Sequence, residues 1–246
     1  MADALLSAQD VTVRFGGLVA VDAVELEVRE RELVGVIGPN GAGKTTFFHA
    51  LSGVLTPTAG RLRLDGVDLT GRPAHVFATR GVARTFQTPR VFREMTAEQN
   101  VRFGLEFAGR ARTHPHDAFD DARSILGFLG LDDAASVPAG ALTPARQRLL
   151  EIGMALGARP RLLLLDEVAA GLTEAEVDAT AALIRRVRDE LGLAVIWIEH
   201  AVRALLNCVE RVAVLHQGRK IADGLPEMVA RDPAVVEAYL GEEVVA

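Results

Sequence analysis

The apolar residues of this chain form short runs typical of strands and longer periodic stretches typical of helices. Residues 33–37, 162–165 and 194–198 are almost entirely apolar. Such runs are typical of strands that are buried on both faces of a parallel sheet. Residues 5–15 and 24–28 alternate between apolar and polar, which predicts strands of an antiparallel edge sheet joined by a glycine turn.

Between residues 88 and about 140 the strand pattern stops and helical periodicity takes over. Residues 96–99 form a capping box that predicts the start of one helix, and residues 117–129 carry the apolar stripe of a second. Thr143 is a favourable N-cap for a third helix that continues to about residue 158. We therefore expect a helical subdomain inserted between two halves of a sheet domain.

Strands and helices alternate again after residue 158. Residues 173–176 form another capping box, which predicts a helix that ends at Gly192. A closing hairpin is expected over residues 209–223, followed by two short helices over 226–240. This order of elements predicts an α/β fold.

A phosphate-binding pattern follows the first apolar run. The pattern G-x-x-x-x-G-K-[ST] is matched at all its fixed positions, by Gly38, Gly43, Lys44 and Thr45. The whole loop consists of Gly38, Pro39, Asn40, Gly41, Ala42, Gly43, Lys44 and Thr45, and Thr46 follows it. Glycines let backbone N–H groups approach phosphate oxygens at a helix N-terminus, Lys44 would reach the β- and γ-phosphates, and the Thr45 hydroxyl would bind Mg²⁺. A chance match in a chain of this length is expected in about one case in a hundred. The stretch predicts a nucleoside triphosphate site.

Further polar residues stand where predicted strands end, which is where ligands bind in open α/β sheets. Asp166 and Glu167 follow an apolar run, so Asp166 would hold Mg²⁺ and Glu167 would polarise an attacking water, unless both are solvated caps. Gln87 is a candidate ligand for metal or water. A neutral His200 would donate to a γ-phosphate oxygen or position water, the alternative being a surface residue. Phe15 would stack on a purine or belong to the core.

Composition narrows the class of protein. With 49% hydrophobic and 24% charged residues, the chain has the composition of a soluble globular protein, and a net charge of -6 argues against nucleic acid as its main partner. The single cysteine allows no internal disulfide, and the N-terminus lacks a signal-peptide pattern, so we expect a cytoplasmic protein. The apolar stretches fall short of the roughly 20 residues of a membrane helix. A metal site at His114 and His116 is not expected, because no acidic neighbour stands in ligand register.

The phosphate loop, Gln87, the strand ending at Glu167 and then His200 closely resemble, in that order, the ATP-binding cassette of ABC transporters. The resemblance covers essentially the whole chain. Further segments are similar to the subfamily that energises branched-chain amino acid import: Phe15 to Val21, Thr85 to Gln87, Phe92 to Thr96, Ala169 to Leu172, Ile198 to His200 and Ala238 to Gly241.

This resemblance implies a P-loop NTPase (RecA-like) core with an antiparallel β edge sheet and an inserted α-helical subdomain. The single cassette would comprise a catalytic core at 1–87 and 159–225, a helical subdomain with the signature helix at 88–158, and a C-terminal helical tail at 226–246. It also implies roles for individual residues: adenine stacking for Phe15, the Q-loop and a Mg²⁺ contact for Gln87, the Walker B Asp for Asp166, the catalytic base for Glu167 and the switch His for His200.

The chain departs from the family pattern in its signature. The usual Leu-Ser-Gly-Gly-Gln falls on Leu142, Thr143, Pro144, Ala145 and Arg146, where only the Leu and a hydroxyl remain. Val168 and Thr173 also replace the residues usual after the catalytic Glu and in the D-loop. In the family, the signature of one cassette closes over the ATP of its dimer partner. A homodimer would carry the altered signature at both sites, so we expect instead a heterodimer in which the partner's site is the weaker one.

The sequence therefore predicts a cytoplasmic ATPase subunit that is peripheral on the inner face of the cell membrane. Its expected cofactors are ATP and Mg²⁺, and its expected partners are a second ABC ATPase subunit, permease subunits and, indirectly, a solute-binding protein. Three alternatives remain open. A soluble cassette protein of translation or DNA repair would be expected to carry two cassettes, a coiled coil or Cys pairs. A non-hydrolysing regulatory subunit is favoured by the altered signature and disfavoured by the presence of Asp166, Glu167 and His200. A P-loop kinase would not explain Gln87 and His200 together.

Overall fold

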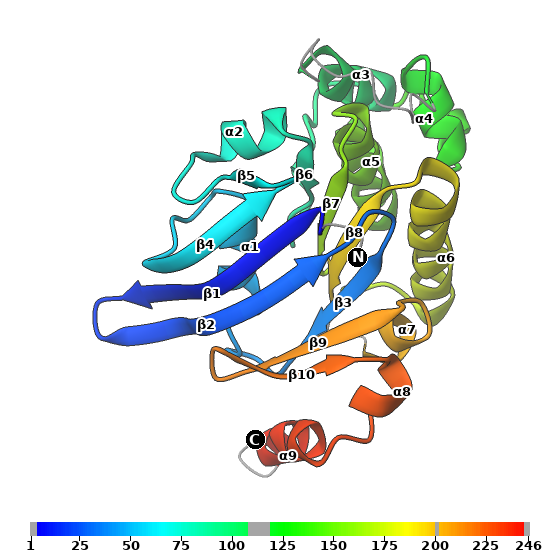
Figure 1. The fold of residues 1–246 in the computed structure, drawn as a ribbon. Helices are drawn as coiled ribbons and strands as arrows, with labels where there is room; N and C mark the ends of the chain where they lie inside the picture. Colours follow the sequence, from blue (N-terminus) through cyan, green and yellow to red (C-terminus); the bar gives the residue numbers. More distant parts are fainter. Residues whose placement is uncertain (1–3, 108–118, 200–201, 244–246) are drawn as a thin grey trace.

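The structure, a computed structural model, describes residues 4–107, 119–199 and 202–243 and contains two β-sheets (Figure 1). The larger sheet has the strand order β10-β9-β3-β8-β7-β6, and all pairs in it are parallel except the β9–β10 hairpin. Its strands are β3 (Leu33–Ile37), β6 (Val82–Arg84), β7 (Leu162–Asp166), β8 (Ala194–Ile198), β9 (Arg211–His216) and β10 (Arg219–Gly224). The predicted parallel sheet is therefore confirmed.

The smaller sheet is antiparallel, as predicted, with the order β2-β1-β4-β5. It contains β1 (Leu6–Phe15), β2 (Leu18–Val28), β4 (Ala59–Leu64) and β5 (Val67–Asp68). The second strand starts six residues earlier than the expected Val24, because pairing with β1 continues through a bulged register up to Phe15 opposite Leu18.

Helix α1 (Lys44–Leu51) packs between the two sheets, and its Phe47 and Phe48 are fully buried there. Alternate residues of β7 point to opposite sides: Leu162 and Leu164 join the core around α1, whereas Leu163 and Leu165 join the core on the other face. This two-sided burial is the reason why the central strands are continuously apolar.

A second core joins the other face of the large sheet to helices that follow β6 and β7 in the sequence (Figure 1). They are α3 (Ala97–Phe107), α4 (Ala122–Phe128), the short η1 (Asp132–Ala134) and η2 (Ala139–Ala141), α5 (Pro144–Gly157) and α6 (Glu174–Leu191). The close approach of helices α3 and α5 requires glycine at two positions. At one of them, Gly104, a Cβ would lie 2.3 Å from the carbonyl oxygen of Met154. The remaining helices are α2 (Ala74–Thr79), α7 (Val202–Leu206), α8 (Pro226–Val229) and α9 (Pro233–Glu243).

The helix ends follow the local capping chemistry. Thr96 and Gln99 exchange side-chain and backbone hydrogen bonds at the start of α3, and Thr173 and Glu176 do so at α6, so both predicted capping boxes are confirmed. Helix α4 begins at Ala122, later than predicted, because Asp121 caps it in a box with Ser124. Helices α2 and α7 are short and were not predicted. In the parts that the structure describes, no helix combines the length and the apolar character needed to cross a membrane.

Candidate nucleotide-binding site

The predicted phosphate loop joins β3 to α1, and its conformation depends on glycine. Gly43, the N-cap of α1, has φ +98° and a Cβ there would lie 2.4 Å from the carbonyl oxygen of Ala20. Lys44, the first residue of α1, is buried, and its ammonium donates to the carbonyls of Gly38 at 2.6 Å and Pro39 at 2.9 Å. The lysine charge is therefore enclosed by the loop itself.

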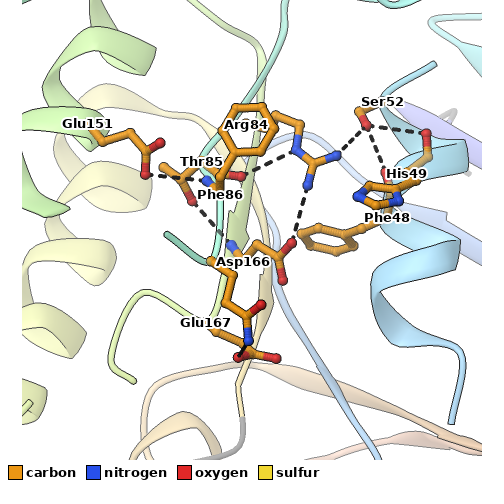
Figure 2. Close-up of polar contacts among 10 residues, drawn as sticks. Phe48, His49, Ser52, Arg84, Thr85, Phe86, Glu151, Asp166 and Glu167 are labelled. Carbon is orange, nitrogen blue, oxygen red and sulfur yellow. Dashed lines mark hydrogen bonds and ion pairs between the residues drawn. The ribbon is translucent and has the colours of Figure 1, made fainter. Parts of the chain in front are cut away.

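Asp166 is the last residue of β7 and is 2% exposed. Its backbone N–H donates to the Thr85 hydroxyl at 3.2 Å, and its carboxylate Oδ2 accepts from Arg84 at 3.2 Å (Figure 2). Thr45, in the first turn of α1, is exposed.

Glu167 and Gln87 are brought together from different strand ends. The Gln87 amide donates to Glu167 Oε2 at 2.7 Å. Glu167 has φ +50°, and its backbone N–H donates to the carbonyl of Ile198 at 2.9 Å, so the residue sits in the left-handed region where the chain leaves the sheet. Such a conformation in a non-glycine residue costs energy and is common at functional sites.

Several side chains that support this site were not predicted from the sequence. Arg148 of α5 donates to the carbonyls of Glu167 and Gln87 and so joins the two segments. Glu199, 1% exposed, accepts from the Ala169 N–H at 2.5 Å and from the Trp197 indole at 3.3 Å, and it holds the turn after Glu167. For Glu199 the sequence does contain a signal, because this charged residue directly follows an apolar strand.

Glu151 of α5 holds the backbone around Gln87. It is 5% exposed, and its carboxylate accepts from the Phe86 N–H at 3.3 Å (Figure 2) and from the Arg90 N–H at 2.8 Å. Burial raises the pKa of Glu151, while these hydrogen bonds and the nearby Arg148 and Arg84 oppose the rise. The helix that carries the predicted signature is thus tied to the segment that carries Gln87.

The predicted signature forms the N-terminus of α5. The Thr143 hydroxyl accepts from the Arg146 N–H at 3.3 Å, and Pro144 occupies the first helical turn. The Arg146 guanidinium forms an ion pair with Asp133 of η1. The nearby Leu142 is largely buried.

The other predicted site residues are placed as follows. Phe15 lies at the turn between β1 and β2 with 51% of its surface exposed, which excludes the core alternative for this side chain. The predicted His200, and also His114 and His116, lie outside the described residues.

A Mg²⁺ ion would need oxygen atoms from outside the protein. Within the described ranges no group of three or more His, Cys, Asp or Glu side chains is arranged to hold a metal. The Thr45 hydroxyl and the Asp166 carboxylate are hard oxygen donors, of the kind that suits a Mg²⁺ that takes its other ligands from phosphates and water. The donor set therefore fits Mg²⁺ bound together with a nucleotide.

Comparison with known proteins gives consistent results. The ABC transporter profile matches residues 21–170, and the profile described as branched-chain amino acid ATP-binding cassette transporter matches residues 219–245. The chain is 41% identical over 254 residues to the high-affinity branched-chain amino acid transport ATP-binding protein BraF of Pseudomonas aeruginosa, covering 98% of this chain and 100% of that protein. It is 39% identical to LivG of Escherichia coli, described in the same words, with 98% and 100% covered.

Solved structures share the fold over nearly the whole chain. The crystal structure of the ADP conformation of an ATP-binding cassette from an ABC transporter matches with a TM-score of 0.86 and 29% identity, over 97% of this chain and 99% of that one. The mixed α/β architecture is thus the P-loop NTPase fold expected from the sequence. The chain therefore belongs to the ABC transporter family, as one of its ATP-binding cassettes.

Proposed function

We propose that this chain is the ATP-hydrolysing subunit of an importer for branched-chain or related hydrophobic amino acids. The observation that carries the proposal is the nearly full-length similarity to BraF and LivG, both named as branched-chain amino acid transport ATP-binding proteins. The match of residues 219–245 to a profile with the same substrate in its description supports the same assignment from a different part of the chain.

In this proposal, the phosphate loop binds the triphosphate of ATP. Lys44 already points its ammonium into the loop, and on binding it would exchange the carbonyls of Gly38 and Pro39 for phosphate oxygens. Thr45 and Asp166 would hold Mg²⁺, which when bound neutralises charge on the β- and γ-phosphates. The exposed Phe15 would stack on the adenine ring.

Glu167 is the proposed general base. A water oxygen attacks the γ-phosphorus, its proton passes to the Glu167 carboxylate, and the bond between the γ-phosphorus and the bridging oxygen breaks to leave ADP and phosphate. The 2.7 Å hydrogen bond from Gln87 fixes the direction of the carboxylate, and the buried setting of Glu167 keeps bulk water from competing. His200, placed by resemblance, would stabilise charge on the γ-phosphate.

The proposed assembly contains a second cassette. The N-terminus of α5 would face the ATP held by that partner, with the Thr143 hydroxyl and the helix dipole directed at phosphate. Pro144 supplies no N–H, and the Arg146 side chain is engaged by Asp133, so this face is a weak anion site. A heterodimer with an intact signature on the partner is therefore proposed.

A groove beside Gln87 is the proposed permease contact, and it would place the chain on the inner face of the cell membrane. It has a volume of about 490 Å³ and lies between the segment from α2 to Phe86 and helices α3 and α5. Its lining is largely apolar and includes Val54, Phe103 and Met154, together with Arg90. A partner in this groove would contact the residues that flank Gln87. A cysteine placed at Arg90 should form cross-links to the permease. Permease cross-links that form only from the tail beyond Pro226, and not from Arg90, would refute this contact.

The function is tested by reconstitution. The chain is co-expressed with the permease and second cassette that co-purify with it, and ATP hydrolysis is measured in proteoliposomes with a purified binding protein. The proposal predicts that leucine- or valine-loaded binding protein stimulates hydrolysis several-fold, while the same protein without ligand does not. Hydrolysis that responds to no hydrophobic amino acid would reject the substrate, and the absence of any membrane partner would favour a soluble cassette protein.

A further inference from the structure

Arg84 makes an unusually complete set of contacts behind the proposed magnesium site. It ends β6, and its side chain is 9% exposed. The guanidinium donates to Asp166 Oδ2 at 3.2 Å, to the Ser52 hydroxyl at 3.0 Å and, through Nε, to the Thr85 carbonyl at 3.3 Å (Figure 2). One buried cation thus joins the end of α1, the end of β6 and the end of β7.

These contacts hold the guanidinium in one place. Ser52 itself donates to the carbonyl of Phe48 at 2.9 Å, so it is fixed to the last turn of α1. On the other side the Phe86 ring lies 4.6 Å from the guanidinium carbon, in a cation–π contact. Because Arg84 is both fixed and buried, its charge acts on Asp166 without the screening that water gives to surface pairs.

The carboxylate of Asp166 therefore has two uses. In the proposed function it holds Mg²⁺, and in the structure it is paired through Oδ2 with the guanidinium of Arg84. Two cations that share one carboxylate repel each other, so the ion pair with Arg84 opposes the binding of the metal at the same time as it fixes the orientation of the carboxylate.

We propose that Arg84 is a positioning residue and counter-ion for Asp166, which sets the Mg²⁺ concentration that nucleotide binding requires. Arg84 balances the buried carboxylate when no metal is bound and keeps its plane fixed for the metal that arrives with ATP. This inference rests on the proposed function, because it takes Asp166 as the metal-holding residue.

The test measures binding of a fluorescent ATP analogue as a function of free Mg²⁺. In Arg84→Gln the charge is lost while hydrogen-bonding groups remain, so the Mg²⁺ concentration at half-saturation should fall by about fivefold or more. Arg84→Lys keeps the charge but not the forked hydrogen bonds, so its half-saturating Mg²⁺ concentration should lie closer to that of the unchanged protein than that of Arg84→Gln does. Arg161→Gln is the matched control: this arginine pairs with Asp65 and Glu30 at the opposite end of β7, and its loss should leave the Mg²⁺ dependence unchanged.

An unchanged or higher half-saturating Mg²⁺ concentration in a folded Arg84→Gln protein overturns the inference. Asp166→Asn separates this failure from a failure of the proposed function: if that variant also leaves the Mg²⁺ dependence unchanged, Asp166 is not the metal-holding residue. If Arg84→Gln does not fold, nuclear magnetic resonance of the unchanged protein replaces it. The guanidinium ¹⁵N signals of Arg84 should shift when Mg²⁺ is added to the nucleotide complex, and the absence of a shift counts against the inference.

Discussion

At the scale of single residues, two glycines of the phosphate loop differ in what surrounds them. Gly41 and Gly43 both have positive φ, at +75° and +98°. A Cβ on Gly41 would meet nothing within 4 Å, whereas a Cβ on Gly43 would collide with the carbonyl oxygen of Ala20. The same sequence motif therefore contains one glycine needed only for its backbone angles and one that is needed for space as well.

This contrast predicts unequal stability losses. Gly41→Ala should lower the free energy of unfolding by about 1–2 kcal/mol, the cost of a left-handed alanine. Gly43→Ala should cost at least about 3 kcal/mol, because overpacking adds to the same backbone cost. Urea unfolding of both variants without nucleotide gives the comparison, and equal losses would show that the loop moves away from Ala20 without strain.

Cys208 gives a prediction about pH. It is buried, its thiol donates to the Ala181 carbonyl at 3.2 Å, and burial raises its pKa from 9.0 to about 11. Below pH 9 the thiol is protonated in both folded and unfolded chains, and its contribution to stability is complete. Between pH 9 and pH 11 only the unfolded chain ionises, so stability falls, by up to about 3 kcal/mol.

Cys208→Ala serves as the reference for this effect, because all other groups titrate alike in the two proteins. Raising the pH from 8 to 10.5 should lower the unfolding free energy of the unchanged protein relative to that of Cys208→Ala. A difference that does not depend on pH would mean that the thiol ionises as readily in the folded chain.

At the scale of elements, the long strands and the well-capped helices could be predicted from the sequence. The three apolar strands and the helices that begin at Thr96, Thr143 and Thr173 were predictable because period and capping agree. Helices α2 and α7 were missed because each is six residues or shorter, too short to show a helical period. The start of α4 was placed too early because the Asp121–Ser124 capping box lacks the usual Glu or Gln.

The same scale contains the link between α5 and the Gln87 segment. Glu151→Gln replaces one of two acceptor oxygens by an NH₂ group, so one of the N–H groups of Phe86 and Arg90 loses its partner. We expect a stability loss of about 1–3 kcal/mol and a fall in kcat for ATP that exceeds any change in KM. Thermal unfolding and steady-state hydrolysis measure the two effects.

Glu98→Gln is the control for Glu151. Glu98 pairs with Arg102 and Arg123, whose side chains are 59% and 67% exposed, so its loss should change stability by less than about 1 kcal/mol and leave kcat unchanged. Equal effects of the two substitutions would remove the special role of Glu151.

At the scale of the whole molecule, the candidate site was predictable where a residue ends a strand, and not where it acts through another residue. Asp166 ends β7, Glu167 follows it and Gln87 follows β6, so the topology of a parallel sheet brings them to one edge. Arg84 and Arg148 support them through contacts between distant segments, which no local pattern encodes, whereas Glu199 is marked only by its position directly after an apolar strand. The proposed asymmetry of the dimer also belongs to this scale.

The asymmetry predicts unequal effects in a heterodimer. The ATP held by Lys44 would meet the partner's intact signature, while the partner's ATP would meet Thr143 and Pro144. Changing Pro144, Ala145 and Arg146 to Gly, Gly and Gln should raise hydrolysis at the partner's site. Glu167→Gln should also cost far more activity than the matching change in the partner, and equal losses with no gain from the repaired signature would refute the asymmetry.

The role of Glu167 as the general base is tested most directly with the Glu167→Gln variant in the assembled transporter. The amide keeps the size of the side chain but cannot accept the proton of the attacking water. Binding of a fluorescent ATP analogue and steady-state release of phosphate are measured on the same preparation. The account predicts ATP affinity within about threefold of the unchanged protein and a loss of hydrolysis of about a hundredfold or more. Hydrolysis at the normal rate would contradict the assignment of Glu167 as the base and, with it, the proposed mechanism.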